Sequence, residues 1–290
     1  MSALLEQLKI SSTALLDEER AELARHLSES LNSADRLPSC SLLLIVAVWS
    51  EEKALKEVAT ELGYRFEKKS HSILGEYFVI GKVGDFEVIA VRTEMGSFGF
   101  AGSAAKAIYF KTATTATTII QLGMAFGIDP TNQKFGDVLV SSSIIPYDRR
   151  DVVATDHGYQ FDYAPAFPAS PARSSIVELF TREQQQNELE FRVQVGAFIS
   201  GSTRISSRLF RDEMVRTLQP LTDNPIIGGE MEGIGLLSVS NPDDPAWVLV
   251  KGISDFADET RHSHIKETRP IACRNAARFV LTALAKASEI

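Results

Sequence analysis

Apolar segments of strand length alternate with helical segments from Leu42 to the end of the chain, and this alternation constrains the fold more than any other feature. The first segment, Leu42–Trp49, is an unbroken apolar run, which is typical of a strand buried on both faces of a sheet. A helical segment, Glu51–Gly63, follows it and ends at a glycine, a common residue at helix C-termini. The alternation predicts the α/β class: a three-layer sandwich in which helices flank a mostly parallel or mixed central sheet.

The later segments continue this pattern. Tyr77–Glu94 predicts a β-hairpin that turns at Gly84-Asp85. The stretch Tyr147–Pro171 is rich in proline and tyrosine and predicts a long loop, and loops of this length often carry function. Further strands are expected at Thr117–Gly127, Gly136–Asp148 and Phe191–Gly201, and further helices at Ser103–Ala113, Ser174–Leu189, Arg211–Leu221 and Pro270–Ser288.

The first forty residues differ from the rest. Leu23, Leu27 and Leu31 recur at a spacing of four, which predicts an amphipathic helix that begins near Asp17. Small residues and Pro38 then break the pattern. We therefore expect a helical extension with a linker, residues 1–40, and a main domain, residues 41–290. The extension is either a helix packed on the main domain or an interaction module.

Acidic residues outnumber basic ones, 38 to 30, which gives a formal net charge of −8. This balance argues against a protein that binds nucleic acid with its whole surface, although a local basic pocket for a phosphate is compatible with it. The two cysteines, Cys40 and Cys273, lack the CxxC or histidine neighbours of a zinc site, so we expect reduced thiols and no metal.

No secretory signal or membrane span is predicted. Polar and charged residues interrupt Met1–Ile10, where a signal would need a continuous apolar core. The run Leu42–Trp49 is far too short to cross a bilayer. We therefore expect a cytoplasmic protein without a membrane partner.

Acidic residues gather where the expected strands end. Glu51 and Glu52 follow the first strand, Glu232 opens a helical segment, and Asp255 ends a late strand. Open α/β sheets bind their ligands in the crevice beyond the strand ends, so these carboxylates are candidates for one site. Each also has a simpler explanation on its own, as an acid at a helix N-terminus or as part of a turn.

A glycine-rich stretch, with Gly96, Gly99 and Gly102, precedes the helix expected at Ser103–Ala113. Glycine lets backbone N–H groups approach a ligand closely, and a helix N-terminus favours negative charge. The spacing matches neither a dinucleotide fingerprint nor a phosphate loop, so tight packing remains the alternative explanation.

Three stretches together resemble a known family. They are "GGEMEGIGLL" (Gly228–Leu237), "VLVKGISDFAD" (Val248–Asp258) and "QLGMAFGIDPTNQKFGDVLVSSS", which begins at Gln121. They resemble the nucleoside phosphorylase and nucleosidase superfamily, and most closely the methylthioadenosine/S-adenosylhomocysteine nucleosidases. The likeness runs from about Leu42 to the C-terminus, which would make residues 41–290 a catalytic domain. It implies an enzyme that needs no cofactor, cleaves an N-glycosidic bond and works as a homodimer or larger homo-oligomer.

The resemblance also implies roles for individual residues. Asp255 would donate a proton to the purine N7, and Glu232 would hydrogen-bond the ribose hydroxyls. Glu51, or Glu52 in its place, would position the attacking water. An oxocarbenium-like transition state makes nearby carboxylates chemically sensible for this reaction. The remaining implied substrate-binding residues are Met231, packed against the sugar, Met95 and Gly96 on the sugar side, Arg204 and Ile205 near the base, and Ser254.

The chain departs from the family pattern in two places. Phosphorylases of this superfamily hold phosphate with a Gly-Asp-Pro-type loop and an arginine after the first strand, where this chain has the acidic "VAVWSEEKAL". Water is therefore expected as the nucleophile. Arg204 stands where the nucleosidases usually have an aromatic residue that stacks on adenine.

Positive charge near the expected pocket favours a phosphorylated substrate such as AMP or ATP. The cations are Arg204 and Arg208 by the base-side loop, Arg150 after a strand, and Lys251 before Ser254. Arginines on a solvated loop are the alternative explanation for each. Some superfamily members in bacterial antiviral defence cleave ATP, and a helical extension would suit coupling to a sensor.

The expected function is therefore an N-ribosyl hydrolase that releases free base from an adenine nucleoside or nucleotide. Two alternatives remain open at this point. A phosphate-dependent purine nucleoside phosphorylase would require inorganic phosphate for activity. A nucleotide-sensing module would bind its ligand without releasing base.

Overall fold

In a computed structural model of the protein, the described residues are 36–114, 116–148, 150–162, 169–241 and 243–287. A boundary between two units of the chain falls between Leu37 and Pro38. The helix expected to begin near Asp17 lies outside the described residues.

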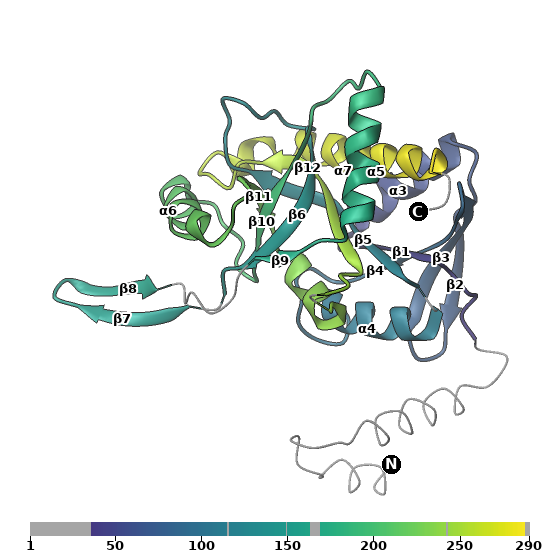
Figure 1. Ribbon diagram of the computed structural model, residues 1–290, viewed down its shortest axis with the longest axis horizontal. Coiled ribbons are helices and arrows are strands. Elements are labelled where there is room, and N and C mark those ends of the chain that lie inside the picture. Colours follow the sequence, from purple (N-terminus) through teal and green to yellow (C-terminus); the bar gives the residue numbers. More distant parts are fainter. Residues whose placement is uncertain (1–35, 115, 149, 163–168, 242, 288–290) are drawn as a thin grey trace, which may run out of the picture. The chain divides into compact units, whose positions relative to one another are not determined.

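A mixed sheet forms the centre of the unit that begins at Pro38 (Figure 1). Among the described residues this sheet has ten strands, in the order β11-β10-β6-β12-β5-β1-β4-β3-β2, with β9 beside β6. β11 also pairs with β5, so β5, β12, β6, β10 and β11 form a closed ring of strands. The bounds are Leu42–Val46 (β1), Glu67–His71 (β2), Gly75–Val83 (β3), Phe86–Arg92 (β4), Thr118–Gly127 (β5), Val138–Pro146 (β6), Ser170–Pro171 (β9), Val193–Ser200 (β10), Ile226–Glu230 (β11) and Trp247–Asp255 (β12).

Helices cover both faces of the sheet (Figure 1). On one face lie α3 (Trp49–Glu61), α5 (Ser174–Gln186) and α7 (Arg261–Ala285). On the other lie α4 (Ser103–Thr114) and the 3₁₀ helix η3 (Gly233–Val239). α6 (Arg208–Leu218) and the short 3₁₀ helix η2 (Gln219–Leu221) follow β10. The predicted α/β fold with a flanked central sheet is thereby confirmed.

The predicted buried strands are confirmed. Every residue of β1 and of β12 is buried, because helices or other strands cover both faces of these strands. α7 packs so closely on β12 that a Cβ at Gly252 would overlap the backbone oxygen of Ala272. This contact places the carboxyl end of β12 against the N-terminal half of α7.

Two predictions about the connections were wrong. The predicted loop Tyr147–Pro171 contains an antiparallel hairpin, β7 (Asp151–Thr155) and β8 (Gly158–Asp162). The last helix begins at Arg261, and Pro270 lies inside it. Proline is common at the first helical position, so the sequence favoured a start there, but packing on the sheet continues the helix on both sides of the proline.

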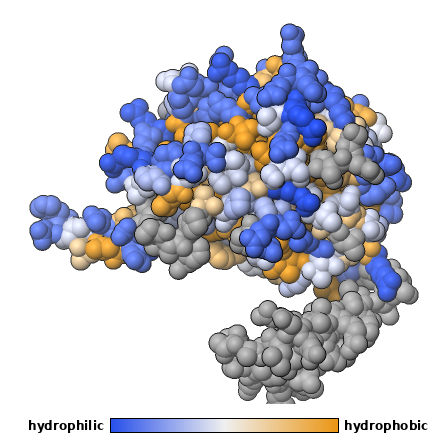
Figure 2. Space-filling model, in the orientation of Figure 1, coloured by the Kyte–Doolittle hydropathy of each residue, from blue (hydrophilic) through white to orange (hydrophobic). Residues whose placement is uncertain are grey.

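The hairpin β7–β8 extends away from the main sheet (Figure 1). Val152, Val153 and Tyr159 are exposed on it, and Figure 2 shows apolar surface on this arm. A two-stranded hairpin alone is only marginally stable in water.

Among the described residues, no helix combines the length and apolar character needed to cross a membrane.

Candidate active site

A pocket lies where β1, β5, β11 and β12 end, at the edge of the sheet where such folds bind ligands. Its wall contains four carboxylates from three segments of the chain: Glu51, Glu230 with Glu232, and Asp255. All four are buried in the protein. Of the predicted site residues, those that line the pocket are Glu51, Met95, Arg204, Ile205, Met231, Glu232, Ser254 and Asp255.

The structure does not bring the other predicted residues into the pocket wall. Gly96 and Lys251 lie behind it, where both contact Glu232. Arg150 lies over the ring of Phe161 instead, 4.1 Å from its centroid. Glu52, the alternative to Glu51, forms an ion pair of 2.8 Å with Arg92 and is not in the wall.

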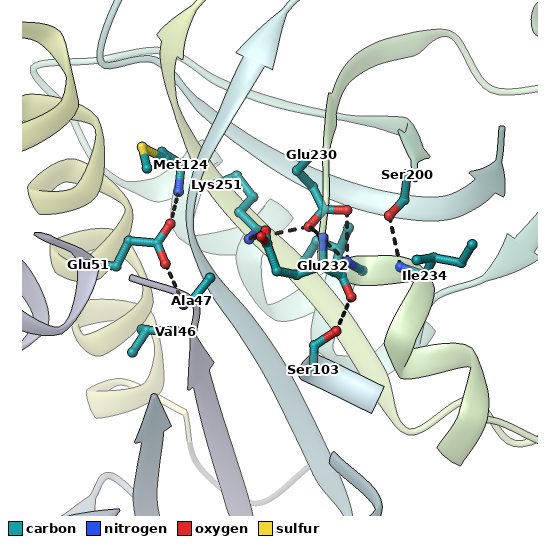
Figure 3. Close-up of polar contacts among 12 residues, drawn as sticks. Val46, Ala47, Glu51, Ser103, Met124, Ser200, Glu230, Glu232, Ile234 and Lys251 are labelled. Atoms are coloured by element: carbon teal, nitrogen blue, oxygen red, sulfur yellow. Dashed lines mark hydrogen bonds and ion pairs between the residues drawn. The ribbon is translucent and has the colours of Figure 1, made fainter. Parts of the chain in front are cut away.

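Glu51 is held by backbone amides (Figure 3). It lies in the first turn of α3, and one carboxylate oxygen accepts hydrogen bonds from the N–H groups of Ala47 (2.6 Å) and Val48 (3.2 Å). The other oxygen accepts from the N–H of Met124 at 2.9 Å, across on β5. A Cβ at Gly123, whose φ is +154°, would overlap this carboxylate. The sheet therefore needs glycine here for Glu51 to lie against it.

Glu230 and Glu232 share the buried cation Lys251 (Figure 3). The Lys251 Nζ lies 3.5 Å from Glu230 Oε2 and 3.8 Å from Glu232 Oε2. Glu230 ends β11 and accepts hydrogen bonds from the N–H groups of Glu232 (2.9 Å) and Gly233 (2.8 Å). Glu232 accepts from the N–H of Gly96 at 2.9 Å, so the glycine stretch orients a carboxylate.

The charges of this cluster are linked. The pKa of Glu232 is raised to about 7, chiefly by burial, with the charges of Glu230 and Glu51 acting in the same direction and Lys251 acting against them. Burial acts to lower the pKa of Lys251, but the charges of Glu230, Glu51 and Glu232 outweigh burial and raise it. Lys251 therefore stays an ammonium ion, while Glu232 exchanges its proton near neutral pH.

The backbone around Glu232 is fixed from two sides (Figure 3). The Ser103 hydroxyl, at the start of α4, donates to the carbonyl oxygen of Glu232. The Ser200 hydroxyl, at the end of β10, accepts from the N–H of Ile234 at 2.8 Å. Rigid neighbours thus set the direction of the Glu232 side chain.

Asp255 ends β12 and is surrounded by hydrogen-bond donors. Its Oδ2 accepts from the Ser254 hydroxyl at 2.9 Å, and its Oδ1 accepts from the N–H of Ala257 at 3.0 Å. The Arg261 Nε, on α7, lies 3.4 Å from Oδ2. Ala257 has a φ of +51°, a strained value for a residue with a side chain. These contacts hold the carboxylate at a defined point of the pocket wall.

The buried Arg211 of α6 supports the segment after Asp255. Its guanidinium donates to the carbonyl oxygen of Phe256 and also to Asp212 Oδ1, at 2.8 and 2.6 Å. The strained turn at Ala257 is therefore clamped by a charged hydrogen bond from a neighbouring helix.

Sequence reasoning gave no site role to three charged residues of the pocket wall: Glu230, Arg261 and Arg269. Glu230 lies two residues before Glu232, and the pairing of β11 that buries it is not visible in the sequence. The two arginines were missed because the helix was expected to begin at Pro270. Among the described residues, no group of three or more His, Cys, Asp or Glu side chains is placed to hold a metal ion.

The arrangement suits acid and base chemistry on one small molecule. Three carboxylates in different surroundings line the same pocket: Glu51 is bound by amides, Glu232 lies beside an ammonium ion, and Asp255 lies beside a guanidinium. Different surroundings give carboxylates different tasks within one site.

Comparisons with known proteins show similarity to nucleosidases. A 5'-methylthioadenosine/S-adenosylhomocysteine nucleosidase of Glaesserella parasuis serovar 5 (strain SH0165) is 26% identical over 231 residues, which are 79% of this chain and 94% of that protein. A death domain-containing ATP nucleosidase of Amphimedon queenslandica is 25% identical over 180 residues, 56% of this chain and 32% of that protein.

The fold is shared with solved structures. The crystal structure of 5'-methylthioadenosine/S-adenosylhomocysteine nucleosidase from Neisseria meningitidis in complex with methylthio-immucillin-A superposes with a TM-score of 0.67 at 20% identity, covering 85% of this chain and 99% of that one. The model of a family described as the Phosphorylase superfamily matches residues 42–285. Since this match spans most of the chain and confirms the resemblance in the sequence, the protein belongs to the Phosphorylase superfamily.

Proposed function

We propose that this protein is an N-ribosyl hydrolase that cleaves the N-glycosidic bond of an adenine nucleoside or nucleotide and releases adenine. The observation that carries the proposal is the convergence of Glu51, Glu232 and Asp255 on one pocket from three distant segments. The similarity to two nucleosidases, whose names specify adenine nucleosides and ATP, supports adenine as the base.

In the proposed reaction the C1'–N9 bond breaks as Asp255 delivers a proton to N7 of the base. The electron pair of that bond leaves with adenine, and the ribose becomes oxocarbenium-like. Glu232 binds the ribose hydroxyls and, as a carboxylate, stabilises the positive charge. Water adds to C1' and gives its proton to Glu51. The products are free adenine and the ribose moiety with a hydroxyl at C1', so one water is consumed.

The amide contacts of Glu51 favour water over phosphate as the nucleophile. The Glu51 carboxylate accepts from the N–H groups of Ala47, Val48 and Met124, so these three donors are not available to a phosphate. The same negative charge would repel a phosphate close by. The phosphorylase alternative therefore has less support than hydrolysis.

The remaining pocket residues fit the proposed substrate. Met95 and Met231 offer flexible apolar surface for a sugar ring, and Ile205 with Phe126 offers apolar surface for a base. Ser254 donates to Asp255 and so fixes the proposed acid. Arg204 is exposed at the rim, where its planar guanidinium is suited to stack on a base or contact an anion.

We also propose that the protein acts as a homodimer or larger homo-oligomer in the cytoplasm. Met95 lines the pocket although it is 52% exposed, and the nearby Phe98 and Phe100 are 75% and 56% exposed. Apolar side chains gathered in this way are a common mark of an interface. Light scattering at micromolar protein concentration tests the oligomeric state, and a monomer at that concentration would contradict the proposal.

Both cysteines are free and buried, which agrees with the reducing conditions of the cytoplasm.

The function is tested by incubating the protein with adenosine, methylthioadenosine, AMP and ATP, with and without inorganic phosphate, and by chromatography for free adenine. Hydrolysis predicts adenine without added phosphate. A strict phosphate requirement would favour the phosphorylase, and tight binding without adenine would favour a nucleotide sensor.

A further inference from the structure

Three arginines line the proposed active site: Arg204, Arg261 and Arg269. Arg261 and Arg269 are both on α7, eight residues apart, which is about 12 Å along a helix. Arg261 lies at the Asp255 end of the pocket wall. Helix α7 therefore presents positive charge along one side of the pocket.

Arg269 lines the same pocket and lies about two helical turns after Arg261. Glu51, in the first turn of α3, also lines this pocket, and α3 packs against α7. The pocket wall therefore carries a second arginine of α7, in addition to the one that pairs with Asp255.

The Nε of Arg269 is buried and has no hydrogen-bond partner within the described part of the chain. The ion pairs of the described residues at the site join Arg261 to Asp255 and Lys251 to Glu230 and Glu232, and none of them involves Arg269. A buried guanidinium N–H without an acceptor is costly, which points to an acceptor brought by a ligand.

A nucleoside offers no anion to meet this charge. In the proposed reaction the base lies at Asp255 and the ribose hydroxyls lie at Glu232, which leaves Arg269 as a cation of the pocket wall that can meet the 5' end of the substrate. A guanidinium matches a phosphate group well, because two parallel N–H donors meet two of its oxygens. We propose that the substrate is a 5'-phosphorylated adenosine and that Arg269 binds its phosphate. This inference rests on the proposed function and specifies its substrate class.

Free phosphate would present the same chemistry to Arg269. The phosphate ester is favoured because the Glu51 carboxylate already occupies the N–H groups of Ala47, Val48 and Met124, so a free phosphate acting as nucleophile would lie close to a fixed negative charge. The experiment distinguishes the two sources.

The test compares AMP with adenosine in the wild-type protein and in Arg269→Gln, in phosphate-free buffer, with adenine measured by chromatography. The wild type is expected to cleave AMP with the higher kcat/KM. Arg269→Gln is expected to raise KM for AMP about 10- to 150-fold, the range for one charged hydrogen-bonded contact, and to change KM for adenosine less than about threefold. Arg269→Lys, which keeps the charge, should restore part of the affinity for AMP.

Arg278→Gln is the matched control. Arg278 is on the same helix but pairs with Glu61 at 2.8 Å and is not in the pocket wall, so both substrates should be cleaved as by the wild type. Circular dichroism and thermal melting check the folding of each variant. Equal losses on AMP and adenosine in Arg269→Gln would mean that Arg269 only balances Glu51, and would overturn the inference.

Two further results would also overturn it: adenosine cleaved at least as well as AMP, or adenosine cleavage that added phosphate accelerates with ribose 1-phosphate as a product. The failure of the proposed function looks different, since no adenine would then appear from any substrate. In that case calorimetry still decides the inference, which requires AMP to bind more tightly than adenosine and to lose this advantage in Arg269→Gln.

Discussion

Replacing Glu232 with glutamine should make the protein more stable at alkaline pH while abolishing its proposed activity. The folded protein raises the pKa of this carboxyl from 4.5 to about 7, chiefly through burial. Protonated Glu232 is therefore favoured in the folded state. Its ionisation costs stability progressively as the pH rises from 4.5 to about 7, and the full cost is present above that range.

The size of the effect follows from the shift. A difference of about 2.5 pKa units corresponds to at most about 3 kcal/mol at pH 8. A glutamine side chain still accepts the hydrogen bond from the N–H of Gly96, and Lys251 keeps its ion pair with Glu230, so Glu232→Gln removes the cost of ionisation without stranding either group. In a domain of this size that gain raises Tm by roughly 10 °C or less.

The assay is chemical denaturation at pH 5 and at pH 8. The stability difference between Glu232→Gln and the wild type should be small at pH 5 and grow in favour of the variant at pH 8. Glu57→Gln is the control, because Glu57 is half exposed on α3 and is not in the pocket wall. A difference of the same size at both pH values would refute the reasoning, since Glu232 would then carry no shifted titration.

Three further predictions concern the site and the domain boundary. Asp255→Asn should lower base release about 10²- to 10⁴-fold, the usual contribution of a general acid, with a normal melting curve, and near-wild-type turnover would contradict its role. Gly123→Ala should displace the Glu51 carboxylate and lower kcat on the order of 10²-fold, and unchanged kinetics would contradict the positioning of Glu51 by the sheet. Deletion of residues 1–37 should leave a folded chain, because the family match begins at residue 42, and insolubility would argue against the boundary.

The sequence predicted the strands and their acidic ends well, for a physical reason. Runs such as Leu42–Val46 are apolar throughout because both faces are covered, and that signal is local in the sequence. The sequence left Glu51 and Glu52 as alternatives. Adjacent residues on a helix point about 100° apart, and only the fold shows that Glu51 faces the amides of Ala47, just after β1, and of Met124 in β5.

The neighbours of a buried charged side chain that come from distant segments of the chain could not be predicted from the sequence. Lys251 was expected to attract an anionic ligand, but the sheet places it between Glu230 and Glu232, which already share its charge. Arg269 gave no signal because Pro270 follows it and suggested a helix start. The effect of a buried charge depends on its neighbours. β11 pairs with β10 and β5, and α7 packs on β12, and no local sequence pattern records these contacts.

The amides around Glu51 suggest how readily this architecture can change its nucleophile. The N–H groups of Ala47, Val48 and Met124 converge on a point where an anion is stable, and the chain supplies that anion from its own α3. Glu51 is in this sense a tethered occupant of an anion site, present at an effective concentration that no dissolved ion can match. Loss of one side chain would vacate the site without disturbing the strands that build it. The choice between water and a dissolved oxyanion would then be decided by a single codon, and the two chemistries of a superfamily could be exchanged while its fold is conserved.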